Sequence, residues 1–92
     1  MLNTSLEIRQ VISAEIARLL DEAGRPVPAI EDGCILTDDL SLDSLALASL
    51  FIALEDRFGV DPFSDKFDIV DMRTVADLNR AYSDTVGVLQ LA

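Results

Sequence analysis

The sequence predicts an all-α protein, a small four-helix bundle of three main helices and one short helix. Apolar residues recur at helical spacing in three separate stretches, and a capping residue precedes each stretch. No segment alternates between apolar and polar residues for long enough to predict a strand. Half of the 92 residues are hydrophobic, so the chain can bury one modest core. We therefore expect a single domain over residues 1–92, with its core at about 4–84 and a tail at 85–92.

The first helix is predicted to begin at Thr4, which forms a capping-box pattern with Glu7. Gly24 and Pro26 end this helix. The residues expected to face inward are Ile8, Val11, Ile12, Ile16, Leu19, Leu20 and Ala23, whereas Glu15, Arg18 and Glu22 are expected on the other side. The connection over 24–43 is long for a small domain, and its length favours a crossover between two helices that pack in parallel.

The second helix is predicted over Ser44 to Phe58. Asp43 is well suited to cap it, because its carboxylate can accept hydrogen bonds from the unpaired amides of the first turn. Gly59 stops the helix, and Pro62 confirms the break. The expected buried stripe consists of Leu47, Leu50, Phe51, Leu54 and Phe58.

The remaining residues predict one short helical turn and a last helix. The short turn is expected over Ser64 to Phe67, followed by an extended segment over 68–72. Thr74 with Asp77 three residues later forms a second capping-box pattern, which opens the last helix. The residues of this helix expected to face inward are Val75, Leu78 and Tyr82. For the apolar tail over 86–92, extension of the helix, fraying and docking on a neighbour all stay open.

The charge of the chain limits its partners. Seven basic and seventeen acidic residues give a net charge of −10, so we expect no nucleic acid and no anionic membrane surface as partner, since both require a basic patch. A basic patch on another protein is the natural complement. The longest apolar run, Leu45 to Leu54, is too short to span a bilayer. The single Cys34 excludes an internal disulfide, and the lack of a signal peptide favours a cytoplasmic location. We expect a monomer.

The residue types present exclude several kinds of catalytic site. The chain has no histidine and one cysteine, so zinc sites and Ser-His or Cys-His nucleophilic systems are not available. The spacing of Asp61, Asp65 and Asp68 resembles a calcium loop only in part, because Lys66 takes the place of its glycine and Met72 that of its final glutamate. A domain this small also offers little cleft to perturb a pKa. We expect no metal site and no catalytic residue, and therefore no enzyme.

The most informative residue is Ser44, which follows the predicted cap Asp43 and precedes Leu45 and a long apolar segment. At the first helical position its side chain is expected to point to solvent. An Asp-Ser pair before an apolar run is first of all a capping signal. Further motifs along the chain raise the weight of a functional interpretation.

Three segments in this order and spacing resemble the acyl carrier protein family. They are residues 39–45 (DLSLDSL), 53–60 (ALEDRFGV) and 72–78 (MRTVADL), and the resemblance extends from about Thr4 to Tyr82. It implies a four-helix bundle in which Ser44 carries a 4′-phosphopantetheine arm, transferred from coenzyme A by a phosphopantetheinyl transferase. The thiol of the arm would hold acyl groups as thioesters for enzymes of fatty acid, specialised lipid or polyketide biosynthesis.

The resemblance also implies a recognition surface for acyl-loading and acyl-transferring enzymes with basic docking patches. The residues expected to form it are Asp38, Asp39, Asp43, Leu45, Glu55 and Asp56. Carriers for bulk fatty acid synthesis usually have acids two and five residues after the serine, and here these positions are Ala46 and Ser49. Their usual glycine three residues before the serine is Ser41. Either a dedicated pathway or drift on a surface with redundant acids accounts for these differences, because single exposed charges contribute little.

Two alternatives stay open at this point. The first is a peptidyl or aminoacyl carrier protein that uses the same arm. The second is a helical protein-interaction module without a prosthetic group, whose apolar second helix docks into a groove on a partner.

Overall fold

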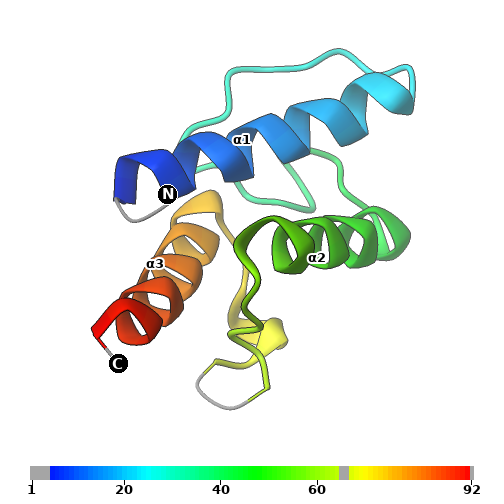
Figure 1. Ribbon diagram of the computed structural model, residues 1–92. Coiled ribbons are helices and arrows are strands. Elements are labelled where there is room, and N and C mark those ends of the chain that lie inside the picture. Colours follow the sequence, from blue (N-terminus) through cyan, green and yellow to red (C-terminus); the bar gives the residue numbers. More distant parts are fainter. Residues whose placement is uncertain (1–4, 65–66, 92) are drawn as a thin grey trace.

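The computed structural model is an all-helical bundle, as predicted, and it describes residues 5–64 and 67–91, without the side chains of 88–91 (Figure 1). Three helices, α1 (Ser5–Glu22), α2 (Ser44–Phe58) and α3 (Val75–Leu91), are joined by long connections, and the short 3₁₀ helix η1 (Ile69–Asp71) precedes α3. Helix α1 packs against both α2 and α3. Thr4 lies outside the described residues.

Helix α1 presents its predicted apolar stripe to the core. Ile8, Val11, Ile12, Ile16 and Leu20 are buried, and Leu19 packs against them. The helix ends one residue earlier than its stripe suggested, so Ala23 is exposed. Gly24 then adopts a left-handed φ of 72°, a conformation that glycine reaches without steric cost. The amide of Arg25 donates to the carbonyl of Leu20 at 2.9 Å, which closes the C-terminus of α1.

Helix α2 runs antiparallel to α1, so the predicted parallel packing is wrong (Figure 1). Its first turns lie beside the end of α1, where Ala46 and Ser49 share a hollow with Leu19. Near its other end, Arg57 pairs with Glu15 of the middle of α1.

The connection over 24–43 is long because it takes part in the core, and not because it crosses over between parallel helices. Leu36, Leu40 and Leu42 are each at most 2% exposed, so this segment contributes three side chains to the core. Backbone hydrogen bonds also join it to the start of α3. The amide of Leu36 donates to the carbonyl of Arg73 at 2.9 Å, and the amide of Val75 donates to the carbonyl of Cys34 at 3.1 Å. The connection therefore forms part of the bundle.

The short helical element lies later than predicted. Residues 69–71 form η1, capped by Asp68, whose carboxylate accepts from the amide of Val70 at 3.2 Å. The prediction of an extended segment over 68–72 is therefore wrong. The turn predicted over 64–67 falls partly on 65 and 66, which lie outside the described residues. An Asp side chain that bonds an amide two residues ahead stabilises such a turn, which explains why the helix begins after Asp68.

Helix α3 opens with the predicted capping box. The hydroxyl of Thr74 accepts from the amide of Asp77 at 3.2 Å, and the carboxylate of Asp77 accepts from the amides of Thr74 and Arg73, both at 3.0 Å. Burial alone would raise the pKa of Asp77, but these hydrogen bonds and the charge of Arg80 together lower that pKa below its ordinary value. The backbone of the tail extends α3 to Leu91.

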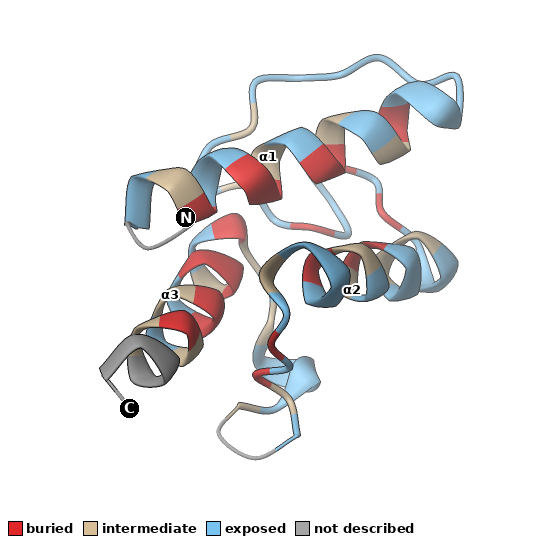
Figure 2. Ribbon diagram, in the orientation of Figure 1, coloured by how far each residue is buried: buried red, intermediate tan, exposed pale blue. Residues whose placement is uncertain are grey.

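An aromatic cluster closes the bundle between α2 and α3. Tyr82 is buried, its ring centroid lies 5.3 Å from that of Phe58 and 6.0 Å from that of Phe63, and Phe63 contacts Phe51 edge-on. Burial raises the pKa of the Tyr82 hydroxyl, and the charges of Asp61 and Glu55 add to this shift. Figure 2 shows that buried residues line the facing sides of α1 and α3, whereas α2 is exposed over much of its surface.

The length and hydropathy of the helices show whether any of them could span a membrane. None of the helices in the described part of the chain combines the length and the apolar character that a membrane span requires.

Candidate functional site

Ser44 is the first residue of α2 and is exposed. Asp43 caps the helix, because it has an extended backbone (φ −80°, ψ 179°) and its carboxylate accepts from the amide of Ala46 at 2.8 Å. The Asp43 carbonyl accepts from the amide of Leu47 at 2.9 Å. Among the described residues, the Ser44 hydroxyl has no hydrogen-bond partner. The capping role therefore falls to Asp43, and the hydroxyl of Ser44 is left free.

The Ser44 side chain lines an open hollow of about 490 Å³ between α2 and the connection that precedes it. The other residues of this hollow are Arg25, Thr37, Ser41, Leu42, Asp43 and Leu47. The hollow has room for a flexible group attached to Ser44, and its position at a helix N-terminus favours negative charge.

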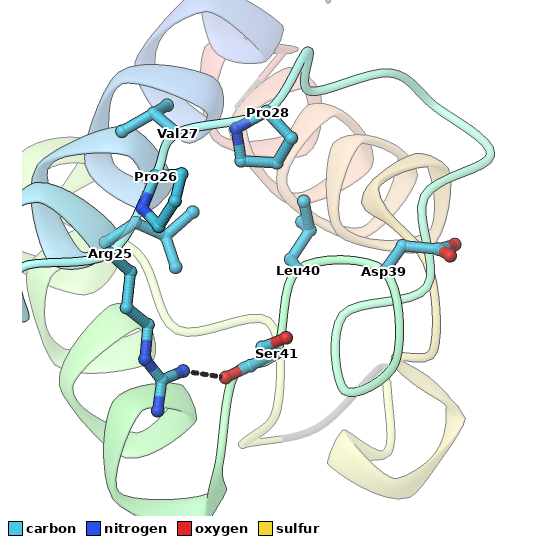
Figure 3. A pocket seen from close by; sticks show the side chains of 8 residues that line it. Arg25, Pro26, Val27, Pro28, Asp39, Leu40 and Ser41 are labelled. Carbon is cyan, nitrogen blue, oxygen red and sulfur yellow. Dashed lines mark hydrogen bonds between the residues drawn. The ribbon is translucent and has the colours of Figure 1, made fainter.

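Ser41 holds a strained backbone beside this hollow. Its φ of 54° lies in the left-handed region, where a non-glycine residue is uncommon. The neighbours Leu40 and Leu42 are both 2% exposed, so the core fixes the backbone on either side. The guanidinium of Arg25 donates to the carbonyl of Ser41 (Figure 3), which gives this outward-turned carbonyl a partner.

The predicted recognition acids are all exposed. Asp43 caps the start of α2, Asp38 and Asp39 lie on the connection that precedes it, and Glu55 and Asp56 lie near its end. Some also have local structural roles, since the carboxylate of Asp39 accepts from the amide of Ile35 at 2.7 Å. Their exposure is compatible with recognition, which stays a prediction.

The outward face of α2 is apolar. We call this face the α2 strip and define it as the exposed residues Leu45, Ala48, Ser49 and Ile52. Leu45 is 76% exposed and Ile52 is 69% exposed. Leu45 was predicted to take part in recognition and Ile52 was not, although a separation of seven residues places both on one face of a helix.

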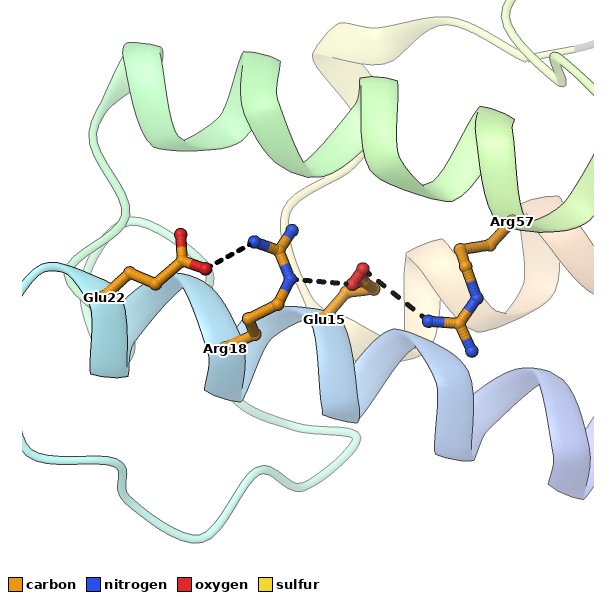
Figure 4. A network of polar contacts seen from close by, with 4 residues as sticks. All are labelled: Glu15, Arg18, Glu22 and Arg57. Carbon is orange, nitrogen blue, oxygen red and sulfur yellow. Dashed lines mark hydrogen bonds and ion pairs between the residues drawn. The ribbon is translucent and has the colours of Figure 1, made fainter.

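A network of charges fixes α2 against α1 (Figure 4). Glu15 is only 6% exposed, and its carboxylate lies 3.2 Å from Arg18 and 3.8 Å from Arg57 of α2. Arg18 also pairs with Glu22 at 2.9 Å. Hydrogen bonds to Glu15 and Glu22 raise the pKa of the Arg18 guanidinium. The expectation that Glu15 faces away from the core is therefore wrong, because Arg18 and Arg57 both pair with its buried carboxylate.

Comparison with known proteins gives the family. No family model matches the chain. The chain is 34% identical over 64 residues to an acyl carrier protein of Thermobifida fusca, which covers 68% of this chain and 78% of that relative. It is 31% identical over 70 residues to an acyl carrier protein of Acidothermus cellulolyticus, covering 75% and 81% of the two chains.

A solved structure agrees with these relatives. The solution structure of MacpD, an acyl carrier protein from Pseudomonas fluorescens involved in mupirocin biosynthesis, matches with a TM-score of 0.78 and 39% sequence identity. The match covers 86% of this chain and 70% of MacpD. Sequence and fold thus lead to the same result, and the chain belongs to the acyl carrier protein family.

Proposed function

We propose that Ser44 is the attachment site of a 4′-phosphopantetheine arm, which a phosphopantetheinyl transferase takes from coenzyme A. The observation that carries this proposal is the free, exposed hydroxyl at the first residue of α2, beside an open hollow. When bound, the arm supplies a thiol that holds an acyl group as a thioester. Cys34 lies away from this hollow and is partly buried.

The residues around Ser44 fit a phosphodiester at this position. The N-terminus of α2 favours negative charge through its macrodipole and its first-turn amides. Asp43 uses its carboxylate to accept a hydrogen bond from the amide of Ala46, which fixes the helix start and therefore the backbone position of Ser44. The chain acts in this proposal as a carrier and not as an enzyme.

The cargo that we propose is an acyl group of a dedicated biosynthetic pathway, with polyketide or specialised lipid synthesis favoured over bulk fatty acid synthesis. Two observations support this choice. No residue from Ser44 to Leu54 carries a charge, so α2 lacks the acids two and five residues after the serine that are usual in a bulk fatty acid carrier. The similar protein MacpD is involved in mupirocin biosynthesis.

The partner surface that we propose combines the α2 strip with the acids at both ends of α2. Apolar side chains at the centre of a contact contribute most of its affinity when they are removed from water. Acids at the rim speed association with a basic patch and restrict its orientation. The partners would therefore have an apolar depression flanked by basic side chains.

The direct test is modification in vitro. We expect incubation with coenzyme A and a broad-specificity transferase to add one phosphopantetheine to the protein, as measured by intact mass. Ser44→Ala should abolish the addition. Ser5→Ala is the matched control, because it changes an exposed serine at the first residue of another helix, α1, and it should be modified fully. No mass gain on the folded protein with several transferases would contradict the proposal and would favour an interaction module without an arm.

A further inference from the structure

Arg25 lies beside the hollow that Ser44 lines, although the two residues are 19 positions apart in the sequence. The residue follows the C-terminus of α1, and its exposed side chain extends toward Ser41 (Figure 3). Arg25 also lines two neighbouring hollows, of about 470 Å³ and about 300 Å³. The start of α2 is therefore bordered by a guanidinium group.

The charge of Arg25 is not paired with a carboxylate in the described part of the chain. Arg9 pairs with Asp32 at 3.0 Å, and Arg18 and Arg57 pair with the acids of the α1–α2 network. The described partner of Arg25 is instead the neutral carbonyl of Ser41. A guanidinium has five N–H donors in a planar fork, so donors remain for a second acceptor.

An anion at Ser44 would lie near a carboxylate, because Asp43 lines the same hollow. Among the residues that line the hollow, Arg25 is the basic one. Guanidinium groups bind phosphate oxygens through strong, charge-assisted hydrogen bonds.

From this arrangement we infer that Arg25 binds the phosphodiester on Ser44 and thereby positions the start of the arm. The inference rests on the proposed function, because it requires Ser44 to be modified. It assigns Arg25 a role in both states of the protein. Without the arm the guanidinium holds the Ser41 carbonyl, and with the arm it also neutralises the phosphodiester. Arg25 is thus a positioning residue, with no part in the transfer reaction itself.

The test compares the unmodified and phosphopantetheine-bearing proteins with Arg25 intact and in Arg25→Gln. Comparing both states removes any effect of the lost Ser41 hydrogen bond, which is common to both. We expect Arg25→Gln to lower the melting temperature of the modified protein by about 2–4 °C more than it lowers that of the unmodified protein. This is the effect expected from the loss of a single ion pair in a domain of this length. The ³¹P resonance of the phosphodiester should shift in the same variant. In 1 M NaCl, where the screening length is about 3 Å, both differences should shrink.

Two further variants sharpen the comparison. Arg25→Lys keeps the positive charge but loses the planar fork of N–H donors. Its melting temperatures and its ³¹P resonance should therefore lie between those of wild type and Arg25→Gln. Arg80→Gln makes the same change of charge on α3, at a residue that does not line these hollows, and it should leave both readouts unchanged.

The outcomes separate the inference from the proposed function. The inference alone would be overturned if Ser44 is fully modified but wild type and Arg25→Gln show the same ³¹P shift and the same difference in melting temperature between modified and unmodified protein. Absence of any mass gain would overturn the proposed function, before the Arg25 variants are compared.

Discussion

At the scale of single residues, the start of α2 uses two neighbouring residues for two different tasks, capping of the helix and exposure of a hydroxyl. Asp43 satisfies the amide of Ala46, and Ser44 keeps its hydroxyl in solvent. A serine that capped the helix itself would have its oxygen engaged by the backbone. The order Asp-Ser therefore matters, because it leaves a free hydroxyl at the helix start while Asp43 accepts a hydrogen bond from an amide of the first turn.

Ser41 gives a prediction at this scale. Its left-handed backbone costs a non-glycine residue about 1–2 kcal/mol, whereas the added freedom of glycine in the unfolded chain costs about 0.4–1 kcal/mol. We therefore expect Ser41→Gly to stabilise the protein by about 0.5–1 kcal/mol, as measured by urea denaturation. The bond from Arg25 is kept, because it uses the backbone carbonyl.

The control for Ser41→Gly is Ser49→Gly, which places glycine inside α2, where φ is already helical. This control should lower stability by about 0.5 kcal/mol, because glycine has a lower helix propensity than serine. Destabilisation by Ser41→Gly as well would show that the left-handed conformation at Ser41 is not strained.

The exposure of Ser44 could be predicted from the sequence, whereas the environments of Glu15 and Arg25 could not. A capping pattern is local, so residues 43 and 44 were enough to place the hydroxyl. Glu15 lies on the buried face of α1, four residues after Val11, but its charge led to the opposite prediction. Its partner from α2, Arg57, is brought close only by the packing of the two helices. Arg25 lies beside the Ser44 hollow because of the path of the connection, and no local sequence pattern predicts this path.

At the scale of elements, the start of α3 offers a prediction with a pH dependence. Asp77 accepts two backbone hydrogen bonds as a carboxylate, and its pKa is lowered in the folded state. We expect Asp77→Asn to lower the free energy of unfolding at pH 7 by about 0.5–2 kcal/mol. A lowered folded pKa gives stability that is present above the unfolded value of about 3.9 and is lost as the pH falls through the folded value.

Accordingly, the difference in the free energy of unfolding between wild type and Asp77→Asn should become smaller below about pH 4. Urea denaturation at a series of pH values would measure it. Asp84→Asn is the matched control, since it removes one exposed carboxylate of the same helix, and it should change stability by no more than about 0.5 kcal/mol. A pH-independent difference for Asp77→Asn would contradict the role of its charge.

Helices were the most predictable elements, and connections the least. The limits of α2 follow from Asp43 and Gly59, which adopts the left-handed conformation (φ 70°) and donates to Glu55. The direction of α2 relative to α1 was predicted wrongly, because a long connection can join antiparallel helices as well as parallel ones. Three leucines of the connection reach the core, and the extra length serves that packing. The position of η1 was missed because a single Asx turn at Asp68 decides it.

At the scale of the whole molecule, the α2 strip and its acidic ends make up the proposed partner surface. We expect Leu45→Ala and Ile52→Ala each to raise the KM of the transferase for this protein by about 5- to 30-fold, with kcat changed less, because apolar anchors contribute about 1–2 kcal/mol each to such contacts. Steady-state kinetics of arm attachment would measure this.

A leucine elsewhere on the surface provides the control for these variants. Leu6 of α1 is 59% exposed, and Leu6→Ala should leave the KM unchanged. Equal KM values for wild type, Leu45→Ala and Ile52→Ala would show that the α2 strip does not contact the transferase.

The measurement that tests the central claim most directly is the mass of the protein purified from the organism that makes it, with the modified residue located by peptide fragmentation. The account predicts one phosphopantetheine group, free or acylated, on the peptide that contains Ser44. An unmodified protein, or an arm on any other residue, would contradict it.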